Sequence, residues 1–142
     1  MKETDVQITN NVDKIVAAIP ERVTELLYAY PCAAVVAGGA IRDAYRGIPP
    51  RDFDVFINPA ISSVFVRKMF GGQYRARGPI QEIKIADDIP LVQVIVSNNP
   101  VEEYKNFDFT VNRVTLAYNK TDKAFTVFGS SLFEQHIAEN KL

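Results

Sequence analysis

Two aspartates separated by one residue, Asp52 and Asp54, have the side chains and the spacing needed for metal chemistry. The apolar stretch around them, through Ile57, predicts a strand, and residues i and i+2 of a strand point to the same face. Two carboxylates aimed at one place repel each other unless a cation lies between them. Oxygen ligands suit Mg²⁺, which shares its remaining positions with water and substrate phosphates. We therefore expect Asp52 and Asp54 to hold Mg²⁺, and two such ions can activate a hydroxyl and stabilise a leaving pyrophosphate.

A glycine pair, Gly38-Gly39, precedes the aspartates and separates a buried apolar run from a short helical pattern. Glycine lets the backbone come close to a ligand, and a helix start offers free N–H groups and partial positive charge. Such a start binds phosphate. Arg42 follows one helical turn later and can donate two hydrogen bonds to the same phosphates. The stretch therefore predicts a nucleoside triphosphate site that performs metal-assisted phosphoryl or nucleotidyl transfer.

Each of these features has an ordinary interpretation when it stands alone. A single Asp-x-Asp is commonly a solvated strand edge, a single Gly-Gly is commonly a turn, and Arg42-Asp43 is commonly a surface pair. Here they occur together in the order strand, glycines, helix, loop, strand. That joint occurrence favours the nucleotide site.

The length and composition limit the remaining possibilities. A chain of 142 residues predicts one domain, residues 1–142, and 47% hydrophobic with 23% charged residues is typical of a globular protein. The net charge of −1 excludes a diffuse basic surface, so a polyanion would bind a local patch or through metal ions. One cysteine, Cys32, and one histidine, His136, exclude a disulfide framework and argue against zinc or triad chemistry. No apolar run has the length of a membrane span, and the polar N-terminus is unlike a signal peptide, so we expect a soluble, cytoplasmic protein.

The elements that must position these residues follow from periodicity. Residues 11–30 predict a helix in which Pro20 either kinks the chain or opens a second helix. Further strands and helices are expected in alternation. The predicted strands are 33–37, 53–57, 74–77, 82–86, 91–97, 110–118 and 124–128, and the predicted helices are 40–46, 62–70 (ending at the glycines 71–72), 100–106 and 129–140. This order predicts an α+β fold with a small, mixed, mostly antiparallel sheet flanked by helices. Residues 1–32 form an N-terminal helical extension before a core of residues 33–142.

Two motifs resemble a known family. The stretch AGGAIRDAYRGIPPRDFDVFI, residues 37–57, resembles the head domain of class II tRNA nucleotidyltransferases (CCA-adding enzymes) and bacterial poly(A) polymerases, with its G-G-x-[VI]-R-D, short loop and D-x-D. FDFTVNRVTLAYN, residues 107–119, is similar to the family's R-R-D-F-T-I-N-A-L-A-Y-N. A weaker similarity, residues 125–142, looks like the hairpin return and last helix of that domain. The resemblance covers residues 35–142.

The resemblance implies a polymerase-β-like nucleotidyltransferase core and an enzyme of the EC 2.7.7 type. It implies an NTP substrate, ATP or CTP, and an RNA or tRNA 3′ end as acceptor. Asp43 would orient Arg42 or cap the local helix. The implied site residues are Gly38, Gly39 and Arg42 for the triphosphate, Asp52 and Asp54 for catalytic Mg²⁺ (two ions with NTP bound), and Asp108, counted as catalytic, with Asn112 for the sugar or the shape of the site.

The sequence departs from the family pattern at two places. Asn106 and Phe107 stand where the family has paired arginines that help to hold the nucleotide, which affects affinity or base choice. Gln93 stands where many members carry a carboxylate that completes a catalytic triad, and a neutral amide is neither a base nor a strong metal ligand. Asp108 or Asp87 is a possible substitute, although a structural hydrogen bond is an equal alternative for Asp108.

The chain ends where the family's neck, which reads the incoming base, would begin. We therefore expect a minimal transferase with another acceptor, or one that works with a partner protein. Alternatives are transfer to a protein or small molecule, as in toxin-like enzymes, and a catalytically weakened nucleotide- or RNA-binding module. A viral source is compatible with a minimal enzyme, which would then act in the host cytoplasm. A cluster of basic residues forms either a patch for RNA phosphates or a solvated face: Arg67, Lys68, Arg75, Arg77 and Lys84.

Overall fold

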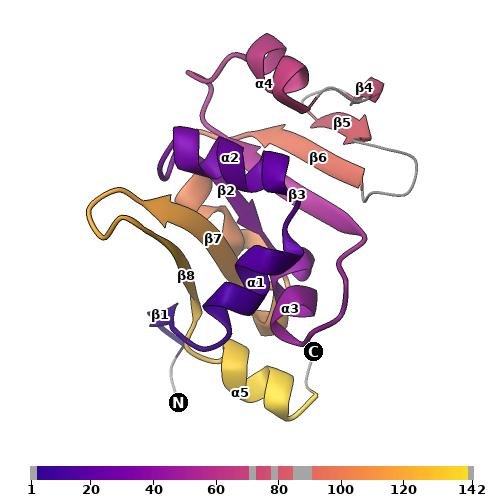
Figure 1. The fold of residues 1–142 in the computed structure, drawn as a ribbon. Helices are drawn as coiled ribbons and strands as arrows, with labels where there is room; N and C mark the ends of the chain where they lie inside the picture. The colour runs from indigo at the N-terminus through magenta and orange to yellow at the C-terminus, as the bar shows by residue number, and fades with distance from the viewer. Residues whose placement is uncertain (1–2, 71–72, 78–79, 85–90, 141–142) are drawn as a thin grey trace.

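Eight strands form one sheet in the computed structural model, which describes residues 3–70, 73–77, 80–84 and 91–140 (Figure 1). The strands are β1 Asp5–Ile8, β2 Ala34–Ala37, β3 Asp52–Ile57, β4 Gln73–Arg77, β5 Ile80–Lys84, β6 Leu91–Val96, β7 Val114–Asn119 and β8 Ala124–Ser130. The helices are α1 Val12–Ala18, α2 Glu21–Ala29, α3 Gly39–Tyr45, α4 Ser63–Phe70 and α5 Phe133–Ala138, with 3₁₀ helices η1 Pro100–Asn106 and η2 Thr110–Asn112.

The strand order is β1-β8-β7-β2-β3-β6-β5-β4. Among the described strands only β3 and β6 run parallel, and all other neighbours are antiparallel. This confirms the predicted α+β fold with a mixed, mostly antiparallel sheet flanked by helices. In the described ranges, no helix combines the length and the apolar character that crossing a membrane requires.

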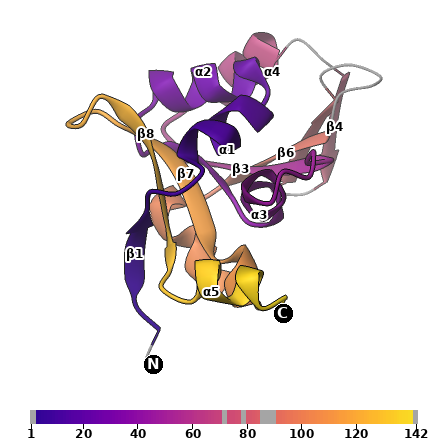
Figure 2. The ribbon, with the colours of Figure 1, turned by 60° about the horizontal axis from the view of Figure 1, so that its bottom comes forward.

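The two faces of the sheet are covered differently, because successive strand residues point to opposite sides. Ala34 and Val36 of β2 belong to the main core, together with buried residues of all five α-helices. Figure 2 shows α1, α2 and α4 on one side of the central strands. Val35 and Ala37 face the other side, where Tyr104 of η1 closes a smaller apolar cluster. The candidate site lies beside this smaller cluster.

The N-terminal segment differs from the prediction of a purely helical extension. Residues 5–8 are a strand that pairs with β8, Asp5 opposite Ser130, and Ile8 is buried in the core. Pairing with the exposed side of β8 satisfies the backbone of both segments, a benefit that local periodicity cannot reveal. Further along, α1 ends before Pro20 and α2 begins after it, so the proline opens a second helix.

Two further elements, β7 and α5, begin later in the structure than the sequence predicts. The strand predicted for residues 110–118 begins only at Val114, because Thr110–Asn112 form a 3₁₀ turn in which the N–H of Asn112 donates to the carbonyl of Phe109. The last helix begins at Phe133, because Gly129 and Ser130 still belong to β8, where Gly129 pairs with Val114 of β7 and Ser130 with Asp5 of β1. The glycines 71–72 and the end of the strand predicted for 82–86 lie outside the described residues.

Candidate functional site

The glycine pair lies beside the first residues of β3. Ala37 at the end of β2 pairs with Asp54, and Gly38 and Gly39 follow directly, so the chain turns into α3 next to the aspartates. The N–H of Gly38 donates to the carbonyl of Val114 at 3.0 Å. Gly38 has φ 88° and ψ −143°, a backbone conformation open essentially to glycine alone. This junction therefore requires a glycine at position 38.

Asp52 and Asp54 share one face of β3, as expected from their spacing. Asp52 is exposed and Asp54 is half-buried, whereas Phe53 between them is buried in the main core on the opposite face. Burial, and secondly the charge of Asp52, raise the pKa of Asp54. No described residue donates a hydrogen bond to Asp54. Asp54 is thus a half-buried carboxylate with a like charge beside it and no compensating hydrogen-bond donor among the described residues.

The carboxylate oxygens of Asp52 and Asp54 are ligands that fit a divalent cation. A cation between the two carboxylates would relieve their repulsion and compensate for the burial of Asp54. Within the described ranges, no third acidic, histidine or cysteine side chain joins them to form a group of metal ligands. In the described part of the chain, the two aspartates are therefore the side chains that fit such an ion.

Gln93 occupies the strand position next to Asp54. The parallel pairing of β3 and β6 sets Asp54 opposite Gln93, and both side chains are half-buried. Residues opposite each other in a sheet share a face. The neutral amide is therefore located directly beside the acidic pair, where the sequence comparison noted a missing carboxylate. Asp87, one of the two suggested substitutes, lies outside the described residues.

Arg42 is held over the glycines by two neighbours. Its Nε donates to Oδ1 of Asp43 at 3.0 Å, and its Nη1 donates to Oδ1 of Asn112 at 2.8 Å. A Cβ atom built on Gly39 would lie 3.3 Å from Nη2. Asp43 thus orients Arg42, one of the two roles expected for it. Nη2 donates to no described residue, so its N–H groups are available to an anion.

Phe107 forms an apolar wall of the site. A Cβ atom on Gly38 would lie 2.8 Å from Cζ of Phe107, and the ring packs edge-to-face on Phe56 with centroids 6.4 Å apart. The sequence identified Phe107 only as the replacement of an arginine. Its contact with Gly38 joins segments far apart in the chain, and no local pattern signals it.

The structure brings most of the predicted site residues close together, but Asp108 makes no hydrogen bond or ion pair with them. Arg42 and Asn112 are in direct contact above Gly39, and Asp54 lies beside the glycine junction. Asp108 follows Phe107 but is exposed, and it makes no hydrogen bond or ion pair with any described residue. Its predicted catalytic role therefore stays a prediction.

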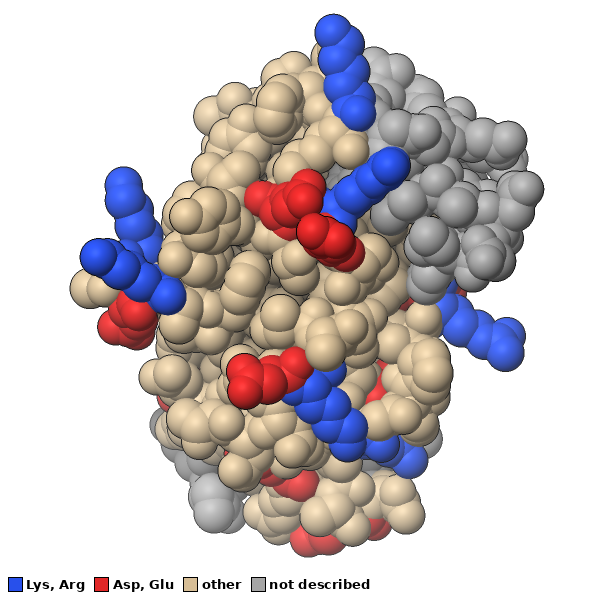
Figure 3. Space-filling model, viewed as in Figure 1, with Lys and Arg blue, Asp and Glu red and all other residues tan. Residues whose placement is uncertain are grey.

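The basic cluster is described only in part. Lys68 is exposed, whereas the side chains of Arg67, Arg75, Arg77 and Lys84 lie outside the described part of the structure. On the face drawn in Figure 3, the coloured basic and acidic side chains are scattered rather than gathered by sign. This mixture agrees with the net charge of −1.

No protein-family model matches the chain, and no curated protein matches it. Solved structures of CCA-adding enzymes do match its fold. One match is the complex of a CCA-adding enzyme with CTP, which is 13% identical in sequence to this chain and superimposes with a TM-score of 0.63. The match covers 98% of this chain and 35% of the enzyme chain. The Thermotoga maritima CCA-adding enzyme complexed with tRNA is 14% identical with a TM-score of 0.64 and the same coverage. An apo tRNA-processing enzyme is 15% identical with a TM-score of 0.60, and 95% of this chain covers 37% of it.

These matches confirm the resemblance to the head domain of class II tRNA nucleotidyltransferases at the level of the fold. The chain spans about a third of the length of the structures it matches.

Proposed function

We propose that the protein is a magnesium-dependent nucleotidyltransferase, which moves a nucleoside monophosphate from ATP or CTP to a hydroxyl group. The favoured acceptor is an RNA or tRNA 3′ end. The observation that carries the proposal is the half-buried carboxylate of Asp54, which accepts no hydrogen bond from the described residues and lies beside Asp52 and the glycine junction next to Arg42. Solved structures of the same fold are complexes with CTP, ATP and tRNA, which supports these substrate classes.

In the proposed reaction, one group of side chains binds the phosphates and another binds the metal. The free N–H groups of Arg42 bind triphosphate oxygens, and Asn112 and Asp43 keep the guanidinium in position. Gly38 and Gly39 permit the close approach of the phosphates. Asp52 and Asp54 would hold Mg²⁺, which supplies charge stabilisation at the phosphates and activation of the acceptor hydroxyl. The acceptor oxygen bonds to the α-phosphorus as the bond to pyrophosphate breaks, and the proton of the acceptor hydroxyl passes to solvent.

A second candidate function is a nucleotide-binding module with weakened catalysis. The neutral Gln93 opposite Asp54 favours it, because the acidic set lacks a third carboxylate at this position. Both candidates require nucleotide binding, and they differ in whether the nucleotide is transferred.

One assay separates these candidates. The purified chain is incubated with Mg²⁺ and each α-³²P-labelled NTP, with and without total RNA, beside an Asp52→Ala/Asp54→Ala variant. The proposal expects label on RNA with the wild type and none with the variant. Label on the protein itself would contradict the RNA acceptor but retain the transferase. NTP binding without transfer would identify the binding module, and no binding at all would overturn both functions.

A further inference from the structure

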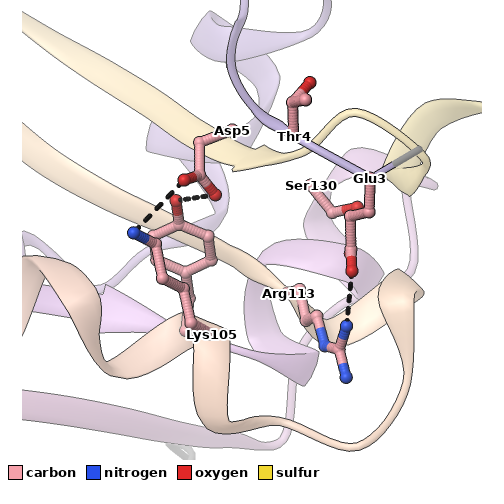
Figure 4. A pocket seen from close by; sticks show the side chains of 7 residues that line it. Glu3, Thr4, Asp5, Lys105, Arg113 and Ser130 are labelled. Carbon is pink, nitrogen blue, oxygen red and sulfur yellow. Dashed lines mark hydrogen bonds and ion pairs between the residues drawn. The ribbon is translucent and has the colours of Figure 1, made fainter.

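The N-terminal strand β1 is fastened at its start to the end of β8. The N–H of Thr4 donates to Oγ of Ser131 at 2.9 Å, and the N–H of Ser131 donates to the carbonyl of Thr4 at 2.7 Å. This paired edge faces the segment of η1 and η2, and a small cavity of about 220 Å³ lies between them. Figure 4 shows this cavity, which is lined by Glu3, Thr4, Asp5, Tyr104, Lys105, Arg113 and Ser130.

Arg113 connects the N-terminal segment to the site segment through two different nitrogens. Nη1 forms an ion pair with Oε1 of Glu3 at 2.6 Å (Figure 4), and Nε donates to the carbonyl of Phe107 at 2.7 Å. Both side chains of the ion pair are about 30% exposed, 29% for Arg113 and 32% for Glu3. The second oxygen of Glu3 is buried and has no hydrogen-bond partner among the described residues. Arg113 is therefore the main compensation for the Glu3 charge.

The groups that Arg113 fixes are those that touch the candidate site. Phe107 is the residue whose ring contacts Gly38, and its carbonyl is held by Nε of Arg113. Asn112 immediately precedes Arg113 and accepts the hydrogen bond from Arg42. The Arg113 side chain thus links the start of the segment 107–112, at the Phe107 carbonyl, to the residue that directly follows its end.

A second contact group supports the same strand from the other end of the cavity. Asp5 accepts a hydrogen bond from the hydroxyl of Tyr104 at 2.6 Å and forms an ion pair with Lys105 at 3.2 Å. The Tyr104 hydrogen bond, followed by Lys105, outweighs burial and lowers the pKa of Asp5. These contacts join β1 to η1. The carbonyl of Tyr104 also accepts the N–H of Phe107 at 3.3 Å, whereas the described contacts of the Lys105 side chain are with Asp5, Glu102 and the Tyr104 ring, so Lys105 is the residue suited to a control. It therefore provides a matched comparison within one cavity.

We infer that Glu3 and Arg113 are positioning residues of the nucleotide site: the Glu3–Arg113 pair braces the segment 107–112, and so holds Phe107 against Gly38 and Asn112 against Arg42. The inference rests on the proposed function of that site, and it gives the residue Glu3, which precedes the N-terminal strand, a role in nucleotide binding. Arginine reaches Glu3 and the Phe107 carbonyl from two nitrogens of a rigid planar group, whereas the three N–H groups of a lysine all leave one nitrogen, so we expect Arg113→Lys to lose or weaken at least one of the two contacts.

The test compares Arg113→Lys and Glu3→Gln with the control Lys105→Gln. Amide hydrogen exchange is measured by mass spectrometry over residues 106–114 and over β2 and β3. In wild type, the N–H groups of Asn112 and Arg113 donate within the turn, so they report on its opening. We expect roughly tenfold faster exchange in this segment for Arg113→Lys and Glu3→Gln, equivalent to about 1.4 kcal/mol, with β2 and β3 unchanged. Lys105→Gln should exchange like wild type.

NTP binding in the presence of Mg²⁺ is measured on the same proteins. The Kd should rise several-fold for Arg113→Lys and Glu3→Gln and stay unchanged for Lys105→Gln. Unchanged exchange over 106–114 in both variants, or an equal loss of affinity in Lys105→Gln, would overturn the brace. If the wild type binds no NTP, the proposed function fails, and the exchange measurement alone decides whether the brace exists.

Discussion

The ionised side chain of Asp54 lowers the stability of the folded state. Its carboxylate is half-buried, has Asp52 beside it and receives no hydrogen bond from the described residues. Desolvation and like-charge repulsion both oppose ionisation in the folded protein. A residue that lowers stability without a structural partner is commonly retained for function.

The raised pKa of Asp54 predicts that its neutralisation stabilises the protein. The folded state binds this proton more tightly than the unfolded chain, so stability falls as pH rises through the interval between the unfolded and folded pKa values. Asp54→Asn should therefore raise the melting temperature at pH 7, and Mg²⁺ should raise the melting temperature of the proteins that retain Asp54 but not that of Asp54→Asn. Exposed Asp122→Asn is the control, and an unchanged Mg²⁺ effect in Asp54→Asn would contradict the metal assignment.

Arg42 should contribute to nucleotide affinity through its geometry as well as its charge. Arg42→Lys keeps one positive charge but loses the separate hydrogen bonds to Asp43, Asn112 and a phosphate. Hydrogen bonds to charged groups contribute about 1.5–3 kcal/mol, so NTP affinity should fall roughly 10- to 150-fold. Arg46→Lys, on an exposed residue just after α3, is the matched control for calorimetric titration. Equal NTP affinities of Arg42→Lys and Arg46→Lys would show that Arg42 does not bind the nucleotide.

The sequence was sufficient to predict the arrangement of Asp52 and Asp54, because a two-residue spacing on a strand determines the shared face. It also predicted a role for Asp43 beside Arg42, because the two are adjacent in the chain. It could not predict the contact of Phe107 with Gly38 or of Asn112 with Arg42, because these depend on how β2, β7 and η2 assemble.

At the scale of elements, the junction between β2 and α3 constrains the site most tightly. Gly38 combines a positive φ with the aromatic ring of Phe107 against its missing side chain. The strand pairing on both sides, with β3 and β7, leaves the junction little room to adjust.

We predict that Gly38→Ala destabilises the protein for two separable reasons. The strained backbone alone costs about 1–3 kcal/mol, and the new Cβ meets the Phe107 ring at 2.8 Å. Urea unfolding should show a loss of at least this size. In a Phe107→Leu background the loss should be smaller, because a leucine can yield where the ring cannot. Gly47→Ala is the comparison, since its φ is also positive but its neighbour is the flexible end of Lys14. An identical loss in both backgrounds would show that the ring contact is unimportant.

The elements themselves were predictable where their signals are local. The apolar spacing predicted helix on both sides of Pro20, with one kinked helix and two helices as the alternatives, and alternation predicted β7 and β8 except at their ends. β1 was not predictable, since four residues acquire strand structure only from the available edge of β8. The 3₁₀ turn at 110–112 was missed because alternation of Val111 with polar neighbours resembles a strand.

At the scale of the whole molecule, the C-terminal helix α5 is tied to the helix that carries Arg42. The hydroxyl of Tyr45 at the end of α3 donates to Oε2 of Glu134 at 2.5 Å, and Asn10 donates to the same oxygen at 2.8 Å. Phe133 packs edge-to-face on Tyr45 in the core. The N-terminal segment, α3 and α5 therefore meet at one carboxylate.

This contact predicts a loss of stability in alkaline solution. Burial, and secondly the Glu134 hydrogen bond, raise the pKa of Tyr45 to about 12. The folded state therefore holds the phenolic proton more tightly than the unfolded chain, whose tyrosine pKa is about 10. The stabilisation is complete below pH 10 and is lost as pH rises toward 12. Urea unfolding between pH 8 and pH 11.5 should show this decline. Tyr45→Phe should cost about 1 kcal/mol at pH 8 and show a shallower decline, and a parallel decline would contradict the assignment.

The central claim is that the glycine junction, Arg42 and the two aspartates form one metal-dependent nucleotide site. The most direct measurement is a calorimetric titration of the protein with ATP and with CTP, at saturating Mg²⁺ and again in EDTA, beside an Asp52→Asn/Asp54→Asn variant. The account predicts saturable binding to one site with Mg²⁺, with the affinity strongly reduced in EDTA and in the variant. Binding that is equally strong in the folded variant, or no binding of either nucleotide by the wild type, would contradict it.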